Sequence, residues 1–396
     1  MTPAPGDCRI QLDVISEGYD RRSEWFQPRI GLIPPATAVL TMTRALLWGS
    51  DVFTAVCIAT SGDAGRTWTP PAPCPELDRR RLADGTEVCP CDMTPAWHAP
   101  SRCLLATGHT ATYHPGPTGG LRIGNSHPRD VAYASLDPAT GRWDDWQTLA
   151  VPDRDAFYWC SAGCAQRLDL PGGDVLLPVS IMDRASVGDN SWHGCFATRV
   201  ARCVYDGRTL SAVEFGDALT VAEPRGLYEP SLALFQGRFF LTLRNDLRGY
   251  VAVGRDGLRF GRPQPWRFDT GEELGSYNTQ QHWIARDDRL FLVYTRRGAE
   301  NDHVFRHRAP LFMAEVDTER LCVRRDTEQI LVPERGAQLG NFGVVNVDAG
   351  EAWVVTSEGM QGDARNPMDV TLAERRGADN RVYLCRLRWP PSPAAP

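Results

Sequence analysis

The segment 276–283, SYNTQQHW, places amide and imidazole side chains beside aromatic rings. Amides exchange hydrogen bonds with hydroxyl groups, and aromatic rings can cover the apolar faces of a sugar. We therefore take Gln281 and His282 as candidate substrate-binding residues, just before a strand-like run. A structural turn followed by a buried tryptophan would have the same sequence. The segment therefore indicates a sugar site only where other polar groups lie beside it.

The cations of the chain favour anionic ligands. The sequence contains 43 lysine and arginine residues, and all of them are arginine. A guanidinium binds a carboxylate through two parallel hydrogen bonds, which suits that ligand better than the point charge of lysine does. A compositional bias of the gene would give the same count, so the argument depends on which arginines meet in space.

A candidate metal site lies at Cys89-Pro-Cys91, with His98 shortly after it. Thiolate and imidazole are zinc ligands, but the Cys-x-Cys spacing is short and no second close pair follows. Cys160 and Cys164 have apolar neighbours, which favours ordinary buried thiols. We therefore predict no metal and no cofactor. Whether Cys89, Cys91 and His98 bind a metal ion stays open.

The elements that must position these groups are short strands. Apolar or alternating runs recur between turn residues, and no convincing helical periodicity accompanies them. In the segment 234–240, Gln-Gly between apolar residues is a hairpin signal. The strand-like runs lie at 37–42, 52–59, 102–107, 175–179, 231–243, 290–295 and 352–356.

One turn sequence repeats along the chain. Residues 61–68, SGDAGRTW, fit the Asp-box pattern (the BNR repeat) at every fixed position, with partial copies at 135–143 and 254–260 and fainter ones at 205–207 and 316–317. In such a turn the aspartate accepts hydrogen bonds from nearby backbone amides and glycine supplies a positive φ. Copies roughly 50 to 75 residues apart suit one four-stranded propeller blade each. We expect these turns to be structural, on the face opposite any active site.

We therefore predict that residues 1–396 form a single all-β domain, a six-bladed β-propeller, with seven shorter blades as the alternative. The segment 380–389 alternates like a strand. It would complete a blade begun by N-terminal residues, which closes the ring and removes exposed sheet edges.

These motifs resemble the sialidase superfamily over most of the chain. The segment 28–34, PRIGLIP, is similar to the first-blade strand of sialidases, which implies that Arg29 binds a substrate carboxylate. The order of Glu229, a hairpin glycine and then Arg244 is also similar. It implies that Arg244 is a second carboxylate ligand, with Arg308 or Arg306 as the third.

The same resemblance assigns acid–base roles. Asp51 is the nearest match to the acid/base aspartate, and Glu229 matches the glutamate that activates a tyrosine nucleophile. Where that tyrosine is expected, the chain has Phe342, which cannot act as a nucleophile. Without a tyrosine, Asp51 and Glu229 would form a carboxylate pair, one as acid and the other as base or nucleophile.

A second branch of sialidase-like propellers, the ulvan-type uronate lyases, gives an alternative. His109, His127 and the pair Tyr228 and Arg244 resemble the residues of those lyases. His109 or Tyr228 would then exchange a proton with the substrate, while Arg244 neutralises the uronate.

The leading hypothesis is a carbohydrate-active glycoside hydrolase that removes a terminal acidic sugar from an oligosaccharide or polysaccharide bearing a carboxylate. A polysaccharide lyase and a non-catalytic glycan-binding propeller are the alternatives.

A net charge of -6 without basic clusters argues against nucleic acid as a partner. The sequence has no run of about 18 apolar residues, so it predicts no membrane span. No signal peptide is visible, and twelve cysteines without one favour free thiols in the cytoplasm.

Overall fold

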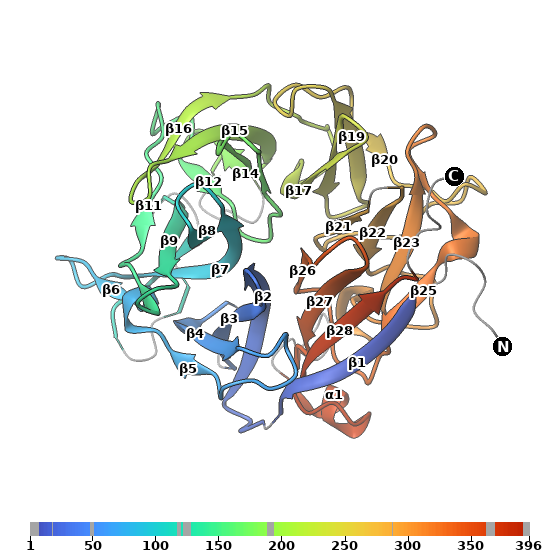
Figure 1. The fold of residues 1–396 in the computed structure, drawn as a ribbon, viewed down its shortest axis with the longest axis horizontal. Coiled ribbons are helices and arrows are strands. Elements are labelled where there is room, and N and C mark those ends of the chain that lie inside the picture. Colours follow the sequence, from blue (N-terminus) through green and yellow to red (C-terminus); the bar gives the residue numbers. More distant parts are fainter. Residues whose placement is uncertain are drawn as a thin grey trace.

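The computed structural model describes residues 8–17, 19–47, 51–116, 120–121, 128–187, 194–286, 288–361 and 369–390. Strands dominate this part of the chain, and its one α-helix is the short α1 (Thr371–Arg375). The strands form six antiparallel sheets that follow one another around a ring (Figure 1). The prediction of an all-β six-bladed propeller is therefore confirmed. In the described residues, no helix has the length and apolarity to cross a membrane.

The first three blades follow the chain order. Blade I holds β2 (Ser23–Ile33), β3 (Thr37–Leu46), β4 (Phe53–Ser61) and β5 (Ala72–Pro73). Blade II holds β6 (Arg80–Arg81), β7 (Glu87–His98), β8 (Cys103–Tyr113), β9 (Val131–Asp137), β10 (Arg142–Trp143) and β11 (Gln147–Thr148). Blade III holds β12 (Trp159–Ser161), β13 (Leu168–Asp169), β14 (Val175–Met182), β15 (Ala197–Tyr205) and β16 (Leu210–Phe215).

The second half of the ring continues in the same way. Blade IV holds β17 (Tyr228–Phe235), β18 (Arg238–Arg244), β19 (Tyr250–Gly254) and β20 (Gln264–Pro265). Blade V holds β21 (His282–Ala285), β22 (Leu290–Tyr294), β23 (Leu311–Asp317), β24 (Cys322–Val323) and β25 (Gln329–Val332). Blade VI holds β26 (Phe342–Asn346), β27 (Glu351–Ser357), β28 (Val382–Arg388) and β1 (Arg9–Ser16).

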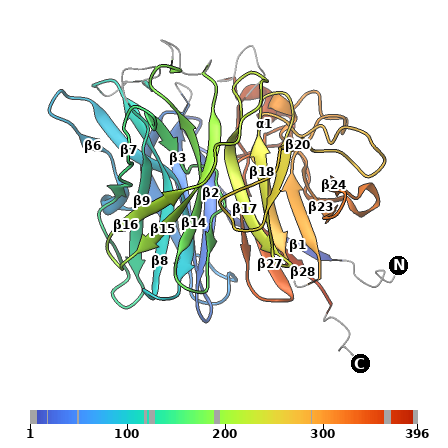
Figure 2. The same cartoon turned by 90° about the horizontal axis from the view of Figure 1, so that it is seen from above.

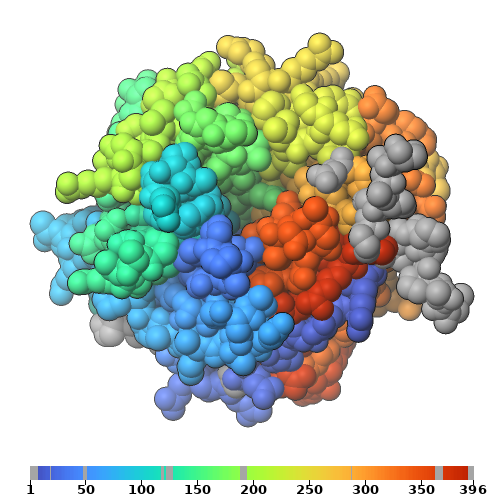
Figure 3. Space-filling view, viewed as in Figure 1, coloured from blue at the N-terminus to red at the C-terminus, as the bar shows by residue number. Residues whose placement is uncertain are grey.

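Blade VI joins the two ends of the described chain. β1 pairs antiparallel with β28, from Arg9 opposite Arg388 to Ser16 opposite Val382. β1, in blue, and β28, in red, consequently lie side by side in Figure 1, and blue and red parts of the surface adjoin in Figure 3. This confirms the predicted closure of the ring by a strand near the C-terminus.

Apolar side chains fill the six seams between adjacent blades. Strands such as β14 are buried along their whole length, because each sheet packs between two neighbouring sheets. Such strands read as continuous apolar runs instead of alternating ones. A large cluster occupies each seam, and the one between blades VI and I includes Leu40, Trp353 and Leu384.

Aspartate turns lie at the ends of β4, β9, β15, β19 and β23, one in each of five blades. Asp63 accepts hydrogen bonds from the amides of Arg66 and Thr67 at 3.0 and 2.9 Å, and Gly65 has a φ of +75°. Strand direction puts these turns at the face opposite the ends of β3 and β18, and the strands run between the two faces of the ring (Figure 2). The other four turns are built on Asp137, Asp206, Asp256 and Asp317.

Candidate functional site

A cavity of about 460 Å³ lies at the propeller axis, and all six blades contribute to its wall. Its volume falls in the range of roughly 300–1,000 Å³ that is typical of small-molecule sites. It opens at the face where inner strands begin and second strands end, opposite the aspartate turns. The lining residues are Phe26, Gln27, Asp51, Phe53, His109, Ala111, Arg129, Cys164, Arg225, Glu229, Arg244, Phe305, Arg306, Arg308, Asn341 and Gln361.

Glu229 and Arg244 meet across the first hairpin of blade IV. Tyr228 pairs with Arg244, and a bulge between Tyr228 and Ser231 leaves Glu229 with a φ of +46°. Nη1 of Arg244 donates to Oε2 of Glu229 at 2.5 Å. Residues held in this left-handed conformation cluster at functional sites, because surrounding structure must offset the strain.

The carboxylate of Glu229 is held in its ionised form. Burial alone would raise its pKa, but the guanidinium of Arg244, helped by those of Arg308 and Arg225, lowers the pKa below the usual value. The side chain is still 21% exposed, so it lines the cavity. The cavity therefore contains one carboxylate suited to act as a base or a nucleophile.

Arg308 binds neutral oxygens. Its Nε and Nη2 donate to the carbonyl of Asn278, and its Nη1 donates to Oε1 of Gln338 at 3.0 Å. Within the described residues it has no ion pair, and burial together with the guanidiniums of Arg244 and Arg306 lowers its pKa to about 9. This end of the cavity carries an excess of positive charge that an anionic group would balance.

Asp51 and Arg306 also line the cavity. Asp51 lies between β3 and β4 with a φ of +54°, and its carbonyl accepts a hydrogen bond from the Tyr113 hydroxyl at 2.9 Å. Arg306 has the same φ, and its guanidinium lies 4.7 Å from the ring centroid of Phe305. Both positions suit contacts with a ligand.

Arg29 is placed differently from its prediction. It is 1% exposed beneath the cavity, where its Nη2 forms an ion pair of 2.6 Å with the equally buried Asp92. The carbonyls of Pro28 and Phe342 and Oε1 of Gln280 accept its other hydrogen bonds. The carboxylate of Asp92 thus occupies the place expected for a substrate carboxylate, and direct contact of Arg29 with a ligand is not supported.

Gln281, His282 and Tyr228 are also buried and do not line the cavity. Gln281 donates to Oγ of Ser276 at 2.7 Å, and Nδ1 of His282 lies 2.7 Å from Oγ of Ser231. The Tyr228 hydroxyl donates to Asp246, and burial raises its pKa. The polar stretch before β21 forms hydrogen bonds within the protein, and the substrate-binding role of Gln281 and His282 stays a prediction.

Phe342 points into the core. Its ring is fully buried between blades V and VI, edge-on to His282 with 5.0 Å between ring centroids. Its neighbour Asn341 lines the cavity in its place, and no tyrosine is among the described lining residues. A tyrosine mechanism therefore has no candidate in the described wall.

His109 lines the cavity, but its nitrogens face the protein. Nε2 lies 3.1 Å from Sγ of Cys91, and Nδ1 packs against Gly163, where an added Cβ would lie 1.8 Å away. Burial, together with Arg129 and Arg29, lowers the pKa of His109 well below its usual value, so the imidazole is neutral. A proton transfer by His109 would first require its ring to turn, which weakens the lyase alternative. His127 lies outside the described residues.

Two cationic residues of the cavity wall were not among the predicted site residues. Arg129 lies over the ring of Trp159, with 4.6 Å between guanidinium carbon and ring centroid. Arg225, with a φ of +64°, pairs with Asp246 at 3.3 Å. Both follow a proline just before a strand. That pattern marks the end of a loop, but it does not show whether the arginine side chain faces the cavity.

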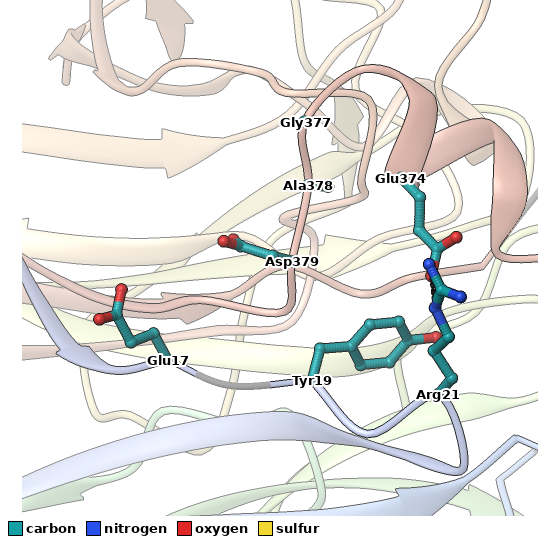
Figure 4. Close-up of a pocket in the computed structure, with 7 residues that line it drawn as sticks. All are labelled: Glu17, Tyr19, Arg21, Glu374, Gly377, Ala378 and Asp379. Carbon is teal, nitrogen blue, oxygen red and sulfur yellow. Dashed lines mark ion pairs between the residues drawn. The ribbon is translucent and has the colours of Figure 1, made fainter.

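The described cysteines form no metal site, and the hollow beside α1 differs in charge from the axial cavity. His98 donates to the carbonyl of Gly173 at 2.9 Å, and no group of three metal-ligating side chains occurs in the described chain. A second hollow lies near α1 on the outer rim, where Arg21 pairs with Glu374 at 2.8 Å (Figure 4). Its lining includes Glu17, Glu374 and Asp379, so it would repel the anionic ligand that the axial cavity favours.

No protein-family model matches this sequence, and no curated protein shows significant similarity to it. Solved structures do match. A protein of unknown function from Dyadobacter fermentans has 14% identity and a TM-score of 0.58, with 96% of this chain and 99% of that chain covered. Trypanosoma rangeli sialidase has 13% identity and a TM-score of 0.61, and a Hadza microbial sialidase has 11% identity and 0.59.

The alignments with the two sialidases cover 97% and 91% of this chain but 60% and 65% of the matched chains. The chain therefore spans less than two thirds of the length of these sialidases. At such low identity the likeness shows the fold: this chain has the six-bladed propeller of sialidases.

Proposed function

We propose that the axial cavity binds the carboxylate of an acidic sugar, and that the protein is a glycoside hydrolase that removes this sugar from the end of a glycan. The buried Arg308 supports the proposal, because its hydrogen bonds go to neutral oxygens and it forms no ion pair with a carboxylate of the described chain. A substrate carboxylate would accept charge-assisted hydrogen bonds there. A structural neighbour, Trypanosoma rangeli sialidase, has been solved in complex with sialic acid.

In this proposal the two carboxylates of the cavity have different catalytic roles. Glu229 is ionised and serves as base or nucleophile, and Asp51 protonates the leaving oxygen. Arg244 and Arg308 orient the sugar through its carboxylate. Glycosidases with such a pair invert or retain the anomeric centre according to the distance between the carboxyl groups.

Turnover of fluorogenic aryl glycosides of acidic sugars, including N-acetylneuraminic and glucuronic acid, tests the proposal. Glu229→Gln should lose nearly all activity while keeping affinity for the free sugar. Glu328→Gln is the matched control. Glu328 forms a similar buried ion pair with Arg296, with 2.7 Å between the charged atoms, and neither residue lines the cavity. Equal activity of Glu229→Gln and wild type would contradict the catalytic assignment.

Two other outcomes identify the alternatives. Products with the ultraviolet absorbance of an unsaturated uronate would identify β-elimination, for which the neutral His109 is the remaining candidate base in the cavity wall. Binding of acidic sugars that depends on Arg308, without turnover of any glycoside, would identify a glycan-binding propeller.

A further inference from the structure

Three aromatic rings form a continuous row beside the axial cavity, between blades III and IV. Trp159 and Phe196 have ring centroids 5.6 Å apart, and Phe196 and Tyr228 have centroids 5.3 Å apart. All three rings are at least nine-tenths buried in one apolar cluster. The row is therefore a packed support behind the cavity wall, with its ends held by β12 and β17.

Guanidinium groups lie on both ends of this row. Arg129 lies 4.6 Å from the ring centroid of Trp159, and Arg244 lies 4.6 Å from that of Tyr228. Both arginines line the axial cavity. Stacking on an aromatic face holds a guanidinium in place without neutralising its charge.

The two ends differ in their charge balance. Arg244 is paired with Glu229 at 2.5 Å. The Arg129 guanidinium has no hydrogen bond or ion pair with any described residue, and the adjacent Asp130 is paired with Arg154 at 2.5 Å. The charge of Arg129 is thus not balanced by an ion pair with any described residue, and Arg129 lies at the far end of the row from the Arg244 and Arg308 site.

We propose that the ligand carries two anionic groups, and that Arg129 binds the second. In this assignment, which rests on the proposed function, Arg244 and Arg308 bind the carboxylate of the terminal sugar. Arg129 binds an acidic group on the adjoining sugar. Both sites line one cavity, so one ligand with two anionic groups can contact both. The substrate class is an acidic oligosaccharide with consecutive charged sugars.

Binding of matched probes tests this assignment. The probes are N-acetylneuraminic acid and its dimer, and galacturonic acid and its dimer, measured by calorimetry on the full chain. Wild type should bind at least one dimer more tightly than its monomer, with a steeper loss of affinity as salt increases. Arg129→Gln should reduce the affinity for that dimer about tenfold and leave the monomer unchanged, as expected for one hydrogen bond to a charged group.

Arg184→Gln is the matched control, because Arg184 lies 4.8 Å from the ring centroid of Tyr158 in the same aromatic cluster but outside the cavity wall. It should bind every probe as wild type does. Equal loss of monomer and dimer in Arg129→Gln, or no loss of either, would overturn the second site and leave the proposed function intact. If wild type binds none of the four probes, the proposed function and the second site both fail.

Discussion

Nη2 of Arg29 lies 2.6 Å from Oδ1 of Asp92, and this ion pair is almost completely shielded from solvent beneath the axial cavity. Arg29 comes from β2 in blade I and Asp92 from β7 in blade II, so the pair joins two blades at the axis. Oδ2 of Asp92 also accepts a hydrogen bond from the amide of Cys164, which lines the cavity. The pair therefore supports the cavity floor from below.

Breaking this pair on one side should destabilise the protein strongly. Asp92→Asn leaves the buried guanidinium without a counter-charge, and the loss of a partner from a buried pair costs about 3–5 kcal/mol. The free energy of unfolding in urea measures the effect. The double variant Arg29→Met with Asp92→Leu should lose less than the sum of the two single variants, and strict additivity would contradict a direct interaction.

Arg308 should discriminate acidic from neutral ligands. In Arg308→Gln the affinity for an acidic sugar should fall by about tenfold or more, because a hydrogen bond to a charged group contributes about 1.5–3 kcal/mol. The affinity for the methyl ester of the same sugar should change little. Calorimetry with both ligands provides the test, and Arg296→Gln is the control away from the cavity. Equal losses for acid and ester would show that Arg308 does not bind the carboxylate.

The ionised state of Glu229 predicts the pH profile of hydrolysis. Arg244 and the neighbouring arginines outweigh the effect of burial and lower the pKa of Glu229 from its ordinary 4.5. If Glu229 acts as base or nucleophile, kcat/KM should decline on the acid side only below that pH. In Arg244→Gln the decline should move to higher pH, because burial remains while the main counter-charge is removed. An unchanged acid limb would exclude Glu229 as the titrating group.

Glu24 should make stability depend on pH. It is 3% exposed, and burial raises its pKa from 4.5 to about 7, although the Met360 amide donates a hydrogen bond to it. Between these two pKa values the folded state binds the proton that the unfolded state has released. Stability from this group is therefore complete below 4.5 and is lost as the pH rises through about 7.

Urea unfolding at several pH values measures this effect. From about pH 5 to about pH 8 the free energy of unfolding should fall more in wild type than in Glu24→Gln, which cannot ionise. The matched control is Glu17→Gln, since the Glu17 side chain is 70% exposed. Parallel pH profiles for wild type and Glu24→Gln would contradict the raised pKa.

The fold was predictable because its signals are local. A complete turn such as 61–68 forms its hydrogen bonds within a few residues, and the apolar runs lie in strands that are buried on both faces. The contact between Glu229 and Arg244 has a similar origin, because both belong to one hairpin and Tyr228 pairs with Arg244.

The remainder of the site depends on contacts between blades. Bulges interrupt β2 between Phe26 and Arg29 and β7 between Cys91 and Thr94, so the alternation of side chains changes face there. A one-residue change of register reverses which side chains point inward. The period of two therefore could not show that Arg29 is buried against Asp92.

The pairing of β1 with β28 also bears on the cavity. This pairing holds two distant parts of the chain together inside blade VI, by backbone hydrogen bonds and by the ion pair of Asp13 with Arg386 at 2.7 Å. All six blades supply residues to the cavity. Separation of β1 from β28 would open the ring and move the cavity-lining residues apart. A ligand that bridges several blades should consequently slow hydrogen exchange in Arg9–Ser16, on the outer edge of blade VI, without touching that strand.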